Sequence, residues 1–162
     1  MKLEPLNARI PALAKDAARA LIVRWDQGDL PADQYVLVEH YDAAPGGAAA
    51  VAVLGVVRAS TREHVATLRI ALDEPGPGGV GAASALLPDA PQSSLAPAIL
   101  DLFRETLGTE TRYLRSLRQH AAAFRATLGA VEPDTKPEPK PAPKPSAVSR
   151  AYPPRNNGRR YP

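Results

Sequence analysis

Residues His64–Leu87, HVATLRIALDEPGPGGVGAASALL, are the most informative segment of the sequence, because they pass from a strand pattern to a glycine-dense loop and then to an alanine-rich helix start. Glycine lets a ligand approach the backbone closely, and the N–H groups at the start of a helix attract anions. The loop therefore predicts a site for a pyrophosphate. A second interpretation stays open, in which PGPGG is only a surface turn.

The composition fits one domain with a hydrophobic core. The chain has 162 residues, 44% of them hydrophobic, and no cysteine, which excludes a disulfide framework and a thiolate metal site. His40, His64 and His120 share no metal-binding spacing, so we predict no metal site.

No apolar run reaches the roughly 20 residues of a membrane helix, and no signal peptide is recognisable. We expect no membrane association, and a place in the cytoplasm or in a particle assembled there.

The sequence divides into a domain, residues 1–133, and a proline-rich tail, residues 134–162. The tail has almost no large aliphatic residue and carries no acidic residue after Glu138, so we expect an extended, disordered segment that binds a protein partner. Its basic residues also allow a nucleic-acid partner, and these are Arg150, Arg155, Arg159 and Arg160. A merely solubilising tail is the alternative.

The domain alternates helix and strand patterns. Residues Met1–Asn7 predict an edge strand, and Pro11–Trp25 predicts a helix with Trp25 in the core. Three strand-like runs then predict an antiparallel meander with its middle strand covered on both faces, namely residues 34–42, 48–58 and 64–72.

Two helical patterns follow the glycine loop. Residues 93–108 predict a helix with Ser94 as its cap and Gly108 at its end. The apolar stripe of residues 109–128 predicts one continuous helix, but Thr111–Leu117 also reads as a strand before a shorter helix.

The order of these segments resembles the GNAT superfamily of acyl-CoA N-acyltransferases. RIALDEPGPGGVGAASALL resembles its strand, glycine loop and helix signature, and HAAAFRATLGAVEP resembles its closing AxxFYxxLGFxE segment. The resemblance implies an α+β fold with a central, mostly antiparallel sheet flanked by helices, and it favours the strand at Thr111–Leu117. Gly76 stands where the family loop begins with Arg or Gln, and Arg125 where the family often has a tyrosine, so the implied activity is weakened or degenerate.

The resemblance also implies an acyl-CoA cofactor, such as acetyl-CoA. Its pantetheine would pair with the backbone around Ile70 and Leu72, and its pyrophosphate would rest on Gly78, Gly79, Gly81 and Ala82. Transfer to an amine requires a base, and the nearest ionisable residues are Glu39, His40 and Glu74, none of which the sequence singles out.

The sequence thus leaves two hypotheses of function. In the first, the chain is a GNAT-like acyl-CoA-binding domain, weakened or degenerate as an enzyme, with a basic tail for a partner. In the second, it is a non-enzymatic structural or assembly protein of a large complex, such as a virion, anchored through its extended tail.

The first hypothesis predicts that acetyl-CoA raises the melting temperature, because a ligand that binds only the folded state stabilises it. Gly79→Asp should abolish that rise, since it places a negative charge where the pyrophosphate must approach. Thermal unfolding of the wild-type and variant proteins with millimolar acetyl-CoA measures both effects. An unchanged wild-type melting temperature would exclude the acyl-CoA hypothesis.

Overall fold

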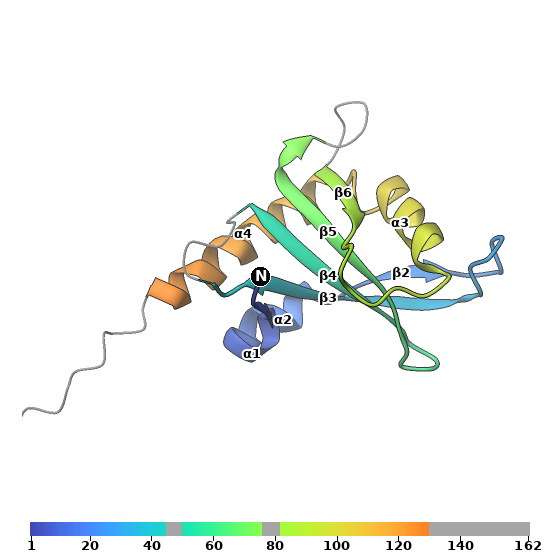
Figure 1. The fold of residues 1–162 in the computed structure, drawn as a ribbon, viewed down its shortest axis with the longest axis horizontal. Helices are drawn as coiled ribbons and strands as arrows, with labels where there is room; N and C mark the ends of the chain where they lie inside the picture. The colour runs from blue at the N-terminus through green and yellow to red at the C-terminus, as the bar shows by residue number, and fades with distance from the viewer. Residues whose placement is uncertain (45–49, 76–81, 130–162) are drawn as a thin grey trace, which may run out of the picture. The chain divides into compact units, whose positions relative to one another are not determined.

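A six-stranded antiparallel sheet with helices packed against it organises the chain (Figure 1). The computed structural model describes residues 1–44, 50–75 and 82–129, except for the side chains of Asp16, Glu74 and Pro75. The predicted α+β class is therefore confirmed, with strands in the order β1-β3-β4-β5-β6 and β2 paired to β3. The predictions that concern residues 134–162 lie outside the described residues.

The N-terminal segment forms strand β1 (Leu3–Pro5), the short helices α1 (Leu6–Arg9) and α2 (Pro11–Ala17), and strand β2 (Arg19–Val23). The edge strand predicted within Met1–Asn7 is confirmed by β1, which pairs with β3. The helix predicted over Pro11–Trp25 is wrong beyond Ala17. The segment RALIV instead alternates with a period of two, so that Leu21 and Val23 face the core and Ile22 faces solvent.

Trp25 is the second correction in this segment. It was predicted in the core, but it follows the end of β2 and its surface is 66% exposed.

The predicted meander is confirmed by strands β3 (Asp33–Asp42), β4 (Val51–Arg58) and β5 (His64–Pro75), which pair antiparallel in this order. The interior of β4 is buried on both faces, as predicted for the middle strand. Gly55 of β4 allows a close approach, because a Cβ atom there would lie 3.3 Å from Cε1 of His40.

Strand β6 (Ala82–Leu86) stands where the sequence predicted the start of a helix. It pairs antiparallel with β5, with Ala83 opposite Ala71 and Leu86 opposite Leu68. The prediction was wrong because alanine favours helices locally, whereas the partner strand β5 decides the conformation of this short segment.

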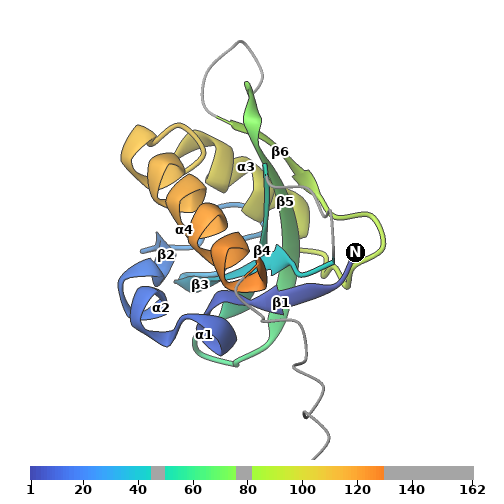
Figure 2. The same ribbon diagram turned by 90° about the vertical axis from the view of Figure 1, so that its left-hand side faces the viewer.

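Two helices complete the domain, α3 (Ala96–Glu105) and α4 (Thr111–Gly129). They pack on the same side of the sheet, α3 against β5 and β6 and α4 against β4 and β5 (Figure 2). Because α4 is continuous, the strand favoured at Thr111–Leu117 is wrong, and the apolar periodicity predicted the correct structure. The predicted cap is wrong too, because Leu95 is the N-cap residue of α3 and no side chain caps the helix. Ser93 Oγ accepts a hydrogen bond from the N–H of Leu95, just before the helix.

The core joins the sheet to the helices through large apolar side chains. Tyr35, Leu54, Leu68, Phe103 and Phe124 are among those completely buried. Within the described ranges, no helix combines the length and the apolarity needed to cross a bilayer.

Gly108 closes the turn between α3 and α4, and Gly108→Ala should destabilise the domain. The Gly108 N–H donates to the carbonyl of Phe103 at 2.7 Å, and an added Cβ would lie 3.0 Å from that oxygen and 3.1 Å from Cα of Arg104. The backbone must move to accept a methyl group, which costs about 1–3 kcal/mol. Urea unfolding measures the loss.

Gly129→Ala is the matched control, because a Cβ at Gly129 would meet nothing within 4 Å. The control should be neutral or stabilising by up to about 1 kcal/mol. Equal unfolding midpoints for the two variants would contradict the described turn.

Candidate functional site

The residues predicted to bind acyl-CoA are described only in part. Ile70 and Leu72 are buried in β5, and Ala82 is buried at the start of β6. Gly78, Gly79 and Gly81 lie outside the described residues.

The backbone around Ile70 and Leu72 has its hydrogen-bonding partners within the domain. Ile70 pairs with Ala52 of β4 on one side and with Ser84 of β6 on the other. The Leu72 N–H donates to the carbonyl of Ala50, and the Leu72 carbonyl accepts from Nε and Nη2 of Arg118 at 3.0 and 2.5 Å. The backbone at Ile70 and Leu72 is therefore already engaged within the domain, and the acyl-CoA site remains a prediction from the sequence.

A hollow of about 390 Å³ lies at this end of β5, lined by Leu72, Asp73, Arg118 and Arg125 among others. Two guanidinium groups and one carboxylate therefore border it. Because Arg118 is held by the Leu72 carbonyl and Asp73 opposes the positive charge, we assign no ligand to this hollow.

The three residues considered as bases do not form one site. Glu39 and His40 are neighbours in β3, so their side chains point to opposite faces of the sheet. The His40 side chain lies over Gly55, and its Nδ1 is 3.0 Å from the Val38 carbonyl. Glu39 is 4% exposed, and its side chain faces α4 on the other side of the sheet. The side chain of Glu74 is not described.

Glu39 anchors a buried polar network that the sequence analysis missed. Its Oε2 accepts a hydrogen bond from the Tyr41 hydroxyl at 2.7 Å and lies 2.9 Å from Nδ1 of His120 on α4. Burial, with the nearby Glu39 carboxylate as a second cause, raises the pKa of Tyr41, so that its hydroxyl stays protonated and donates. The sequence held a signal for this network, because Glu39 occupies a core position in the alternation of Tyr35, Leu37 and Tyr41.

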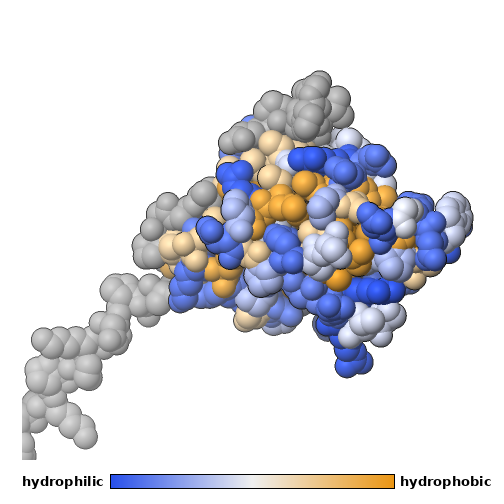
Figure 3. Space-filling view, turned by 45° about the vertical axis from the view of Figure 1, so that its right-hand side comes forward, coloured by the Kyte–Doolittle hydropathy of each residue, from blue (hydrophilic) through white to orange (hydrophobic). Residues whose placement is uncertain are grey.

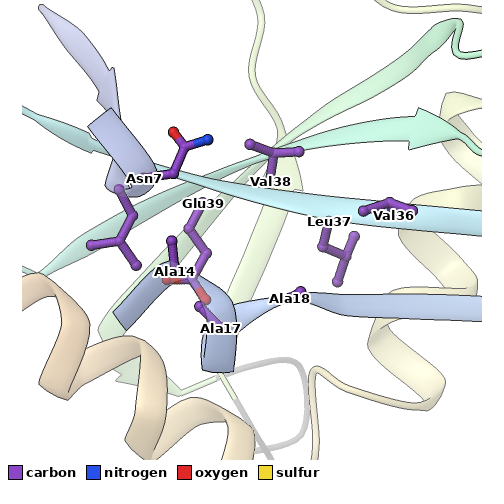
Figure 4. A pocket seen from close by; sticks show the side chains of 9 residues that line it. Asn7, Ala14, Ala17, Ala18, Val36, Leu37, Val38 and Glu39 are labelled. Atoms are coloured by element: carbon purple, nitrogen blue, oxygen red, sulfur yellow. The ribbon is translucent and has the colours of Figure 1, made fainter. Parts of the chain in front are cut away.

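Two buried polar atoms of the described residues have no hydrogen-bond partner, Oε1 of Glu39 and the hydroxyl of Tyr113. Glu39 also lines a cavity of about 170 Å³ between β3 and the helices α1 and α2, together with Ala14 and Ala17 (Figure 4).

Among the residues that the structure describes, no three histidine or carboxylate side chains gather closely enough to hold a metal ion.

The cavity lies at a break in the sheet edge. On this edge of β3, strand β1 ends with Pro5 opposite His40, and β2 begins with Arg19 opposite Leu37. Val38 and Glu39 are thus left without a strand opposite them, and α1 and α2 span the break.

A second unusual feature is the outer edge of β2. In the described part of the chain β2 pairs with β3 alone. Ile22 is 62% exposed and Trp25 66%, although both are large and apolar. A groove of about 220 Å³ is lined by Ile22, by Leu102 of α3, and by Leu107, which follows α3 in the sequence.

Figure 3 turns the α3 side of the molecule forward and shows apolar surface gathered in the middle of this face. Strand β6, at the opposite end of the sheet, differs from β2 because a side chain caps it. Nη2 of Arg104 in α3 donates to the Ser84 carbonyl at 2.6 Å, and the N–H of Ala82 donates to Gly108. Among the described residues, the outer edges of β2 and of the shorter β1 pair with no further strand, and β2 is the one of these two that carries exposed Ile22.

Comparison of the chain with protein-family models, with curated proteins and with solved structures finds no match. The resemblance to the GNAT superfamily therefore rests on the sequence motifs alone.

Proposed function

We propose that the domain is a non-enzymatic structural subunit that associates with a second copy of itself through the outer edge of β2. The observation that carries this proposal is the exposure of Ile22 and Trp25 beside an uncapped edge strand. A free strand edge offers unpaired N–H and C=O groups to another strand, and proteins that remain monomeric usually protect such an edge with charge, proline or a covering segment.

The sequence of β2 contains none of these protections between its ends. Ala20–Val23 has no charge, proline or glycine, and Arg19 stands only at its start. Burial of one large aliphatic side chain contributes roughly 1.5–3 kcal/mol to the free energy of association. Burial of Ile22 and Trp25 at the contact would therefore stabilise a dimer in addition to the hydrogen bonds between the strands.

A two-fold antiparallel pair of β2 strands is compatible with the side chains. If the pair is centred on Leu21, Ile22 lies opposite Ala20 of the partner subunit and Arg19 lies opposite Val23 of the partner subunit. A large residue then meets a small one on the exposed face, and no two like charges face each other. The isologous contact needs only one surface, which suits a closed dimer.

The tail extends this proposal to a larger assembly. Residues 134–162 would add a second contact to a protein partner, and two linked contacts raise the overall affinity without a stronger interface at either site. The partner of the tail stays a prediction.

The proposal predicts that the full-length protein dimerises with rising concentration, and that Ile22→Lys weakens the dimer at least about tenfold, because the variant buries a charge at the contact. Sedimentation velocity over a concentration series measures the association. Ala126→Lys is the matched control, since Ala126 is exposed on α4 and a lysine there should change nothing.

The absence of cysteine allows a direct test of the register. An oxidised mixture of the Ala20→Cys and Ile22→Cys proteins should form a covalent heterodimer, because residues opposite each other in antiparallel strands lie within disulfide reach. Ala126→Cys mixed with either protein should remain uncrosslinked. A wild-type protein that stays monomeric at every concentration, or crosslinking no faster than in the control, would contradict the proposal.

A further inference from the structure

Helix α4 carries positive charge without any negative charge. Of the 13 Lys and Arg residues within residues 1–129, four lie on α4, whereas none of the 14 Asp and Glu residues of that range does. The four are Arg112, Arg115, Arg118 and Arg125. The domain as a whole is close to neutral, so α4 is a local region of positive potential that attracts anions.

One face of α4 is exposed along the length of the helix, and this face is the exposed stripe. Helical spacing brings its five exposed residues to the same side: Arg112, Arg115, Gln119, Ala122 and Ala126. In Figure 2, α4 runs across the front of the view, and no other helix or strand lies over its outer side. The stripe is therefore accessible to a large partner.

The two arginines of the stripe are available for such a partner. Among the described residues, no carboxylate lies within ion-pairing distance of Arg112 or Arg115. The other two arginines differ, because Arg118 donates to the Leu72 carbonyl and Arg125 lies close enough to Asp42 to lower the pKa of its carboxyl group. The available charge is thus in the N-terminal half of α4.

Arg112 and Arg115 do not stabilise the helix that carries them. Arg112 lies in the first turn, where the helix dipole favours negative charge. The two residues are three positions apart, so that their like charges are neighbours and repel each other. A bound polyanion would remove both unfavourable effects, which favours a binding role over a structural one.

The side chains of the exposed stripe indicate which polyanion fits. Guanidinium groups donate two hydrogen bonds at once to a phosphate, and the small Ala122 and Ala126 let a rigid backbone approach the helix. The stripe has no aromatic ring on which the bases of a single strand could stack, and no large apolar side chain that could enter a membrane. It extends about 21 Å from Arg112 to Ala126, and a DNA duplex presents a phosphate about every 1.7 Å of its axis.

We propose that the exposed stripe of α4 binds the phosphate backbone of double-stranded nucleic acid, without preference for sequence. Arg112 and Arg115 contact phosphates, and Gln119 donates a hydrogen bond beside them. The stripe and the β2 edge belong to different elements, so the failure of one proposal leaves the other standing.

The test measures the binding of the full-length protein to fluorescently labelled DNA duplexes of about 20 base pairs and two unrelated sequences, by anisotropy at about 50–200 mM KCl. Both duplexes should bind saturably and with equal affinity. Replacing both arginines, Arg112→Gln with Arg115→Gln, should weaken binding about tenfold at the lowest salt. The slope of log K against log salt should become shallower by about 1.8, because each lost phosphate contact removes about 0.9.

Two further variants separate the stripe from net charge. The double variant Lys15→Gln with Arg24→Gln removes two exposed charges from other elements and should bind within about twofold of the wild type. Ala126→Lys adds a cation to the stripe and should strengthen binding and steepen the slope by about 0.9. Every protein keeps residues 134–162, so any contribution of the tail is the same in all of them.

A competitor and a melting curve complete the test. Poly-L-glutamate should compete at least about tenfold less well than unlabelled duplex, because an extended chain carries a charge only about every 3.5 Å. The α4 double variant should unfold at no lower temperature than the wild type, since like-charge repulsion is removed.

The proposal is overturned if the wild-type protein shows no saturable binding to the duplex, or if the α4 double variant keeps the wild-type salt slope. An equal loss in the Lys15 and Arg24 variant would reduce the effect to net charge, and equal competition by poly-L-glutamate would exclude the nucleic-acid class. A lower melting temperature of the α4 double variant would instead assign Arg112 and Arg115 a structural role.

Discussion

The pairing of β3 sets the positions of the other strands and of the last helix. This ten-residue strand pairs with β4 along one edge, while two shorter strands, β1 and β2, share its other edge. Because β1 and β2 are joined through α1 and α2, they cannot form one continuous strand, and a break remains at Val38 and Glu39. The break creates the cavity, and the offset of β2 leaves its outer edge unpaired within the described domain.

The same strand ties the sheet to the last helix. Glu39 of β3 and His120 of α4 are 81 residues apart in the sequence, yet their side chains meet 2.9 Å apart in the core. Tyr41 adds a second polar contact to Glu39, and its ring packs against Phe124 of α4 with centroids 5.4 Å apart. A buried polar network of this kind fixes how α4 lies on the sheet, because an alternative packing would leave buried polar groups without hydrogen-bond partners.

The sequence predicted well wherever a local pattern was strong. Alternating apolar residues located β3, β4 and β5, and the stripe through Leu117 and Phe124 indicated one helix, although the family resemblance favoured a strand there. Alanine-rich segments misled the prediction, because alanine favours a helix locally, whereas β2 and β6 are strands through their pairing with β3 and β5.

The candidate sites were less accessible to prediction than the fold. Glu39 was considered as a base, but its partner His120 was set aside because contacts between distant segments leave no spacing to recognise. The exposure of Trp25 was missed because a large aromatic residue after an apolar run usually lies in a core. In the structure Trp25 lies on no helix and follows the end of β2.

If the outer edge of β2 is an interface between copies of this chain, strand pairing protects its outward N–H groups from exchange with solvent. Amide hydrogen exchange, measured residue by residue at low and high protein concentration, detects this protection. Amides of Ala20–Val23 that face away from β3 should exchange more slowly as concentration rises, while the amides of β6 keep their rates. Exchange in β2 that is independent of concentration would contradict this interface.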